Sequence, residues 1–111
     1  MNVKITPAPL RGMLAAIASK SDAHRLLICA AFADRVTEIS LASTSRDIEA
    51  TGRCLAALGA GIEKTETGLR VTPAKQAERS PLLDCGESGS TLRFLLPVAA
   101  AVSGTPTLTG A

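Results

Sequence analysis

The stretch GESGSTLRFL, from Gly86 to Leu95, places two glycines and three small hydroxyl residues directly before an arginine and an apolar run. It follows the apolar segment LLDC at residues 82–85, which predicts a strand. It leads into TLRFLLPVAAAVS at residues 91–103, whose apolar spacing predicts a helix. A strand, a flexible turn and a helix in this order are typical of α/β proteins.

A second stretch, ASKSDAHRLL at residues 18–27, has the same character. From Asp22 the apolar residues recur at helical spacing and predict a helix that ends near Asp34, with Ser21 as its N-cap. A shift of 68 residues superposes the two regions and aligns five identical pairs: Arg25 with Arg93, Leu27 with Leu95, Ala31 with Ala99, Ala33 with Ala101, and Thr37 with Thr105. The sequence therefore predicts two copies of one supersecondary unit, the second of them incomplete.

The rest of the chain fits this pattern of short elements. Strands are predicted at 2–6, 12–18, 36–42 and 105–111, a helix at 47–61 capped by Thr44 or Ser45 and closed by Gly59 and Gly61, and a hairpin at 61–73 that turns at Glu66-Thr67-Gly68. Residues 74–81 read as a polar connector. We predict an α/β (α+β) fold with a first unit at 19–80 and a truncated second unit at 81–111.

Composition excludes several classes of function. The only aromatic residues are Phe32 and Phe94, so the chain has no stacking platform for single-stranded nucleic acid. A net charge of +2 gives no general attraction to nucleic acid or membranes. The three cysteines form no CxxC pair and the single His24 has no neighbouring ligand, which argues against a metal site. Buried free thiols and the absence of a signal-peptide pattern predict a cytoplasmic protein.

The two turns have the chemistry of anion sites. A helix N-terminus leaves backbone N–H groups unpaired and carries partial positive charge, and small residues let a ligand approach. Basic side chains lie one turn further along each helix. The first turn supplies Lys20, Ser21 and Arg25, and the second supplies Ser88, Gly89, Ser90 and Arg93. In repeated units both helix starts would point in the same direction. They would then form two neighbouring anion-binding sites for a substrate with two negative groups.

Simpler explanations remain open at this point. Serine and glycine at a helix start serve capping alone in many proteins, and Lys20 is equally explained as a solvated amine. Arg25 or Arg93 would also be explained by ion pairs with Glu38 or Glu87. Neither turn matches the phosphate-binding motifs GxxxxGK[ST] or GxGxxG.

The stretches SKSDAHRLLICAAFA and LDCGESGSTLRFLLPVAA, with ASTSRDIEATGRCLAALGA between them, resemble the 5-enolpyruvylshikimate-3-phosphate synthase family from Ile5 to Gly110. The resemblance implies transfer of the enolpyruvyl group of phosphoenolpyruvate to shikimate 3-phosphate in chorismate biosynthesis, with no cofactor and no metal. It implies two domains, each of three βαβαββ units, with strands at 1–18 that pair with the other domain.

The resemblance also implies site residues. Lys20, Ser21 and Arg25 would bind shikimate 3-phosphate, and Lys20 and Gly89 would bind phosphoenolpyruvate. The residues Ser88, Ser90 and Arg93 would support them. The family often has Asn where this chain has Glu87.

The family's acid/base carboxylates lie beyond Ala111, so the resemblance implies an N-terminal fragment that is inactive alone and docks on the remainder of the enzyme. A UDP-N-acetylglucosamine enolpyruvyl transferase and a non-enzymatic anion-binding domain are the alternatives.

Overall fold

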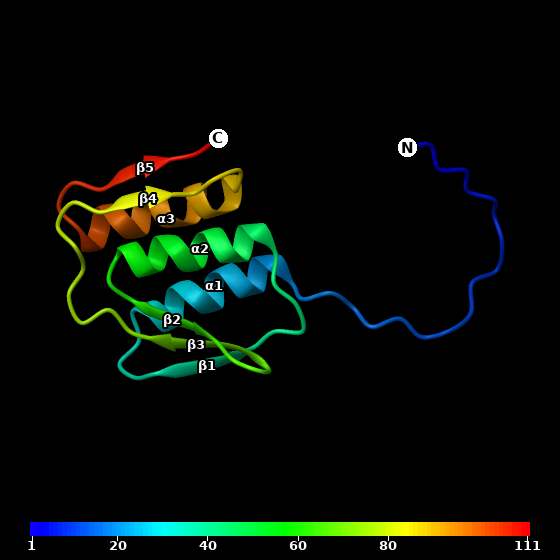
Figure 1. The fold of residues 1–111 in the computed structure, drawn as a ribbon, viewed down its shortest axis with the longest axis horizontal. Coiled ribbons are helices and arrows are strands. Elements are labelled where there is room, and N and C mark those ends of the chain that lie inside the picture. The colour runs from blue at the N-terminus through cyan, green and yellow to red at the C-terminus, as the bar shows by residue number, and fades with distance from the viewer.

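The computed structural model describes residues 1–111 and confirms a mixture of helices and strands (Figure 1). The helices are α1 at Lys20–Ala31, α2 at Arg46–Ala57 and α3 at Gly89–Val102. The strands are β1 at Thr37–Ser40, β2 at Gly61–Lys64, β3 at Gly68–Thr72, β4 at Leu82–Asp84 and β5 at Thr107–Thr109.

The first sheet is antiparallel, with the strand order β1-β3-β2. Strands β2 and β3 form the hairpin that the sequence predicts, and β3 also pairs with β1 through the partners Ile39 and Leu69. At the end of this ladder the backbones approach closely. A Cβ atom on Gly68 would lie 2.0 Å from the carbonyl oxygen of Ile39, so no side chain fits there.

Helix α2 lies between α1 and α3, and α1 covers the first sheet (Figure 1). Small buried residues let the three helices approach one another, among them Ala23, Ala50 and Cys54. Leu27, Leu55, Leu58, Val71, Leu83 and Leu95 fill the space between helices and sheets and belong to one buried cluster. A single core therefore fixes how the helices lie relative to one another.

The second sheet contains only β4 and β5, which pair in parallel, and α3 makes the crossover between them. The predicted strand, turn, helix and strand of residues 82–111 are thus present. When the sequence is shifted by 68 residues, α1 overlaps α3, and β1 overlaps β5.

The two strands predicted at 2–6 and 12–18 are absent. Residues 1–19 contain no helix or strand, and they run away from the body of the molecule (Figure 1). Residues 1–17 are exposed along their whole length. An extended segment becomes a strand only through hydrogen bonds to a neighbouring strand, and this segment has none in the structure.

Some helix boundaries also differ from the prediction. Ser19, rather than Ser21, caps α1: its hydroxyl oxygen accepts from the backbone N–H of Asp22. The spacing Ser19-x-x-Asp22 has the form of a capping box, which explains the earlier start. Helix α1 ends at Ala31 instead of near Asp34, and α3 starts at Gly89 instead of Thr91.

Helix α2 also ends earlier than predicted, at Ala57, with Leu58 as its C-cap. Gly59 then takes a φ of +108°, which closes the helix as expected. Gly61, predicted to help close the helix, instead begins β2. Of the two N-caps predicted for α2, Thr44 and Ser45, the structure shows Ser45.

Candidate functional site

All three helices begin at the same end of the molecule (Figure 1). Each has a serine N-cap whose hydroxyl oxygen accepts a backbone N–H: Ser19 from Asp22, Ser45 from Ile48 and Ser88 from Thr91. The remaining N–H groups of each first turn have no partner within the helix. Three partial positive charges therefore gather at this end.

Lys20 lies among these helix starts, in the first turn of α1. Its Nζ atom is 2.5 Å from Oδ2 of Asp47, in the first turn of α2. The Lys20 hydrogen bond is the main reason that the pKa of Asp47 lies below its usual range, and the nearby Ser88 hydroxyl lowers it further. The Lys20 side chain remains 54% exposed. The ammonium is therefore fixed by α2 and still open to a ligand.

Ser88 connects this ion pair to the glycine-rich turn. Ser88 is 4% exposed, and Thr91 is fully buried. The Thr91 hydroxyl lies 2.7 Å from Ser88 Oγ and 3.3 Å from the main-chain oxygen of Asp47. The structure thus brings Lys20 of α1 and Thr91 of α3 to the same residue, Asp47 of α2, although the three are far apart in the sequence.

Arg25 lies further along α1 and is exposed. Its Cζ atom is 5.5 Å from the centroid of the Phe94 ring, a cation–π distance, and its Nη1 atom is 3.9 Å from Oδ1 of Asp22. The alternative pairing of Arg25 or Arg93 with Glu38 or Glu87 is wrong: Glu38 pairs with Arg70, and Glu87 is in no ion pair.

The other predicted residues are on the surface. Gly89, Ser90, Arg93 and Ser21 are exposed, and Arg93 makes no ion pair. Apart from its chain neighbours and the backbone of its own helix, no atom lies within 4 Å of the position that a Cβ on Gly89 would take. A ligand can therefore approach the start of α3 without moving the protein.

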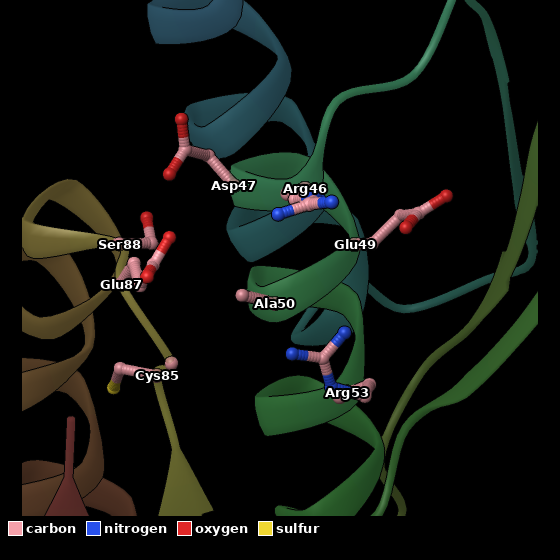
Figure 2. A pocket seen from close by; sticks show the side chains of 9 residues that line it. Arg46, Asp47, Glu49, Ala50, Arg53, Cys85, Glu87 and Ser88 are labelled. Atoms are coloured by element: carbon pink, nitrogen blue, oxygen red, sulfur yellow. The ribbon is translucent and has the colours of Figure 1, made fainter. Parts of the chain in front are cut away.

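A polar pocket of about 480 Å³ lies between α2 and the turn from β4 to α3. Figure 2 shows Arg46 and Arg53 on α2, with Glu87 and Ser88 across from them. The lining is completed by Asp47, Glu49, Ala50, Cys85 and Gly86. Of the predicted site residues only Ser88 lines this pocket, so it borders the Lys20–Asp47 pair without containing the predicted cluster.

Asp47 is the residue that sequence reasoning missed. A carboxylate in the first turn of a helix is already explained by its favourable interaction with the helix dipole. In addition, nothing in the sequence shows that α2 lies beside α1. Thr51 and Thr91 were missed for a similar reason, since threonine inside an apolar helix carries no signal of a polar contact across helices.

The structure contains no group of three or more His, Cys, Asp and Glu side chains that could hold a metal ion. None of its helices is both long enough and apolar enough to cross a membrane.

The fold and the site define a mixed α/β protein in which helix N-termini and a basic side chain gather at one end. The family model described as EPSP synthase (3-phosphoshikimate 1-carboxyvinyltransferase) matches residues 5–111. The chain belongs to this family.

Curated relatives carry the name 3-phosphoshikimate 1-carboxyvinyltransferase. The protein from Clostridium beijerinckii is 42% identical over 111 residues, which cover 93% of this chain and 26% of the relative. The protein from Clostridium kluyveri is 41% identical, covering 97% of this chain and 26% of the relative. The protein from Clostridioides difficile is 40% identical over 93% of this chain and 26% of its own length. The chain thus spans about a quarter of the relatives it matches.

Proposed function

We propose that this chain, as part of a longer enzyme, takes part in transfer of the enolpyruvyl group from phosphoenolpyruvate to shikimate 3-phosphate with release of phosphate. The observation that carries the proposal is the Lys20 ammonium, held by Asp47 at 2.5 Å where the three helices begin. Family membership and the names of the relatives support the same reaction.

The proposed binding roles follow from charge and position. An ammonium has three donors, and the bond to Asp47 leaves two for ligand oxygens. Lys20 would therefore contact both substrates, with Ser21 and Arg25 on the shikimate 3-phosphate side. The open backbone at Gly89 would approach phosphoenolpyruvate. Ser88, Ser90 and Arg93 are supporting residues in this proposal.

The remainder of the enzyme supplies the other parts. General acid/base groups must lie within hydrogen-bond reach of the reacting atoms, and we propose that these carboxylates belong to a second domain. Residues 1–18 would pair with that domain, 19–80 would form a first unit and 81–111 the beginning of a second. The proposed reaction uses no cofactor and no metal.

The proposed setting is the cytoplasm, where the thiols of Cys29, Cys54 and Cys85 stay reduced. Neither nucleic acid nor a membrane is a partner in this proposal. The remainder of the enzyme is the docking partner of this chain, and residues 1–18 are the part that would pair with its second domain.

The test is phosphate release by the longer enzyme with Lys20→Ala. Loss of a charge-assisted contact to each substrate should cost about 1.5–3 kcal/mol per contact, so kcat/KM should fall by at least about tenfold. Lys64→Ala is the matched control, because Lys64 also pairs with a carboxylate in the first turn of α2, Glu49, but belongs to β2 and not to the predicted cluster. Equal kcat/KM values for the Lys20→Ala variant and the parent would contradict the proposal.

A further inference from the structure

The Phe94 ring of α3 lies against two consecutive side chains of α1, and the proposed function gives it no role. Its centroid is 5.5 Å from the Cζ atom of Arg25 and 5.8 Å from the centroid of the His24 ring. The first distance is that of a cation–π contact, and the second is that of an aromatic pair. Phe94 therefore joins directly the two helices that begin at the predicted anion sites.

The Phe94 ring has a fixed place. Phe94 is half-buried, and the next residue, Leu95, is fully buried in the core. His24, against which the ring packs, is 1% exposed, and its Nδ1 atom lies 2.7 Å from Thr51 Oγ1 in α2. The ring is thus backed by side chains that are themselves held in place, and it offers Arg25 a rigid surface.

Arg25 is otherwise held only weakly. Its side chain is 62% exposed, and its one ion pair, with Asp22, spans 3.9 Å between two exposed side chains. Exposed pairs of this kind contribute little. An unsupported arginine side chain loses rotamer freedom when a ligand fixes it, and this loss weakens binding. A ring that already restricts the side chain reduces the loss.

The contact with Phe94 also leaves the positive charge of Arg25 available. A carboxylate partner neutralises a guanidinium, whereas a ring attracts it through the negative face of its π system and adds no net charge. Arg25 and Phe94 are each five residues past the first residue of their helix, and helical side chains lean toward the N-terminus. Both side chains therefore lean toward the end of the molecule at which α1 and α3 begin (Figure 1).

We infer that Phe94 is a positioning residue for Arg25: its ring holds the guanidinium in place for an anionic group of the substrate. The inference rests on the proposed function in taking Arg25 as a ligand of shikimate 3-phosphate. It adds that the affinity for this ligand depends on an aromatic ring at position 94 of α3.

Three variants separate the ring from its bulk. Phe94→Leu removes the ring and keeps a large apolar side chain that favours a helix. Phe94→Tyr keeps the ring. Phe32→Leu is the matched control, because Phe32 is the other phenylalanine of the chain and lies at the C-cap of α1.

The first experiment is calorimetric titration of shikimate 3-phosphate against the longer enzyme. Phe94→Leu should raise the dissociation constant about two- to fivefold, the effect of one cation–π contact at a partly exposed site. Phe94→Tyr and Phe32→Leu should bind like the parent. Tighter binding by Phe94→Leu would overturn the inference, because the ring would then hold Arg25 away from the ligand.

The same titration tests whether Phe94 acts through Arg25. In an Arg25→Ala background, Phe94→Leu should change the dissociation constant no further, since the ring has no cation to hold. The same loss with and without Arg25 would overturn the inference. If Arg25→Ala weakens binding and Phe94→Leu does not, the inference fails and the proposed function stands. Parental affinity in Arg25→Ala would refute the proposed role of Arg25 itself.

Steady-state kinetics distinguish positioning from a general disturbance of α3. Gly89, the proposed contact for phosphoenolpyruvate, begins the same helix, so a displaced α3 would also raise the KM for phosphoenolpyruvate. The inference predicts that Phe94→Leu raises the KM for shikimate 3-phosphate and leaves that for phosphoenolpyruvate unchanged. An equal rise in both constants would overturn it.

Discussion

Gly89 is the first residue of α3, and no atom outside its chain neighbours and its own helix backbone lies within 4 Å of the position that a Cβ would take. Gly89→Ala should therefore leave the fold intact or slightly more stable, because alanine favours a helix by up to about 1 kcal/mol over glycine. If phosphoenolpyruvate approaches this backbone, the methyl group should raise its KM and spare that of shikimate 3-phosphate. Steady-state kinetics of the longer enzyme measure both constants, and an unchanged KM for phosphoenolpyruvate would rule out the close approach.

His24 should dominate the pH dependence of stability in mildly acidic solution. Burial lowers its pKa in the folded chain from the ordinary value of 6.5. Below pH 6.5 the unfolded chain binds a proton that the folded chain does not, so the free energy of unfolding should fall as the pH is lowered. Above this pH both forms are neutral and the dependence should vanish.

Urea denaturation of the 111-residue chain from about pH 8 to about pH 5 checks this prediction. The other groups with shifted pKa values are carboxyls, thiols and one arginine, whose ordinary pKa values lie outside this window. A flat profile between these limits would mean that His24 is no less easily protonated in the folded chain than in the unfolded one.

At the scale of single residues the sequence predicts which types of side chain matter, but not all of their contacts. Lys20, Arg25 and Gly89 are predicted as site residues from their places at or near helix starts. Asp47 is not, because its contact with Lys20 depends on how α1 and α2 pack, and that packing is set by the whole buried core.

Among the elements, the sharpest steric constraint lies where β3 begins. A Cβ on Gly68 would come within 2.0 Å of the Ile39 carbonyl oxygen and 2.7 Å of the Leu41 nitrogen, both main-chain atoms that cannot move aside cheaply. Gly68→Ala should therefore separate β1 from β3 and lower the free energy of unfolding by several kcal/mol. Thermal or urea unfolding measures the loss, with Gly89→Ala as the control that has room for its methyl group. Equal stability of the two variants would refute the close approach.

Most elements could be predicted from local sequence because their signals are local. The hairpin of β2 and β3 follows from alternation around Glu66-Thr67-Gly68, and α2 follows from its apolar periodicity and the Ser45 cap. The prediction of strands at 2–6 and 12–18 was wrong. Alternation of apolar and polar residues shows that a segment can pair with a strand, but it does not show that a partner strand is present. The N-cap of α1 was misplaced because two serines compete and only Ser19 has an acidic residue three positions later.

At the scale of the whole molecule, the chain is expected to bind anions without catalysing transfer. The acid/base carboxylates of the proposed reaction belong to the second domain, and two carboxylates in the first turn of α2, Asp47 and Glu49, are paired with Lys20 and Lys64. A general acid or base needs a free proton position beside the reacting atoms. The purified 111-residue chain should therefore release no phosphate from the two substrates together, and measurable release above a no-protein blank would contradict this.

The central claim is that Lys20 and Arg25 bind substrate together. The alternative is that they only stabilise helix α1. Isothermal titration of shikimate 3-phosphate against the longer enzyme tests it most directly. Lys20→Ala and Arg25→Ala should each weaken binding by about 1.5–3 kcal/mol, the effect of one lost charge-assisted contact.

The matched control is Ser19→Ala, which removes the N-cap of α1 and should cost about 1 kcal/mol of stability while changing affinity little. We expect Lys20→Ala and Arg25→Ala to weaken binding and to keep near-parental melting temperatures. We expect Ser19→Ala to lower the melting temperature and to keep near-parental affinity. Parental affinity in both Lys20→Ala and Arg25→Ala would contradict it.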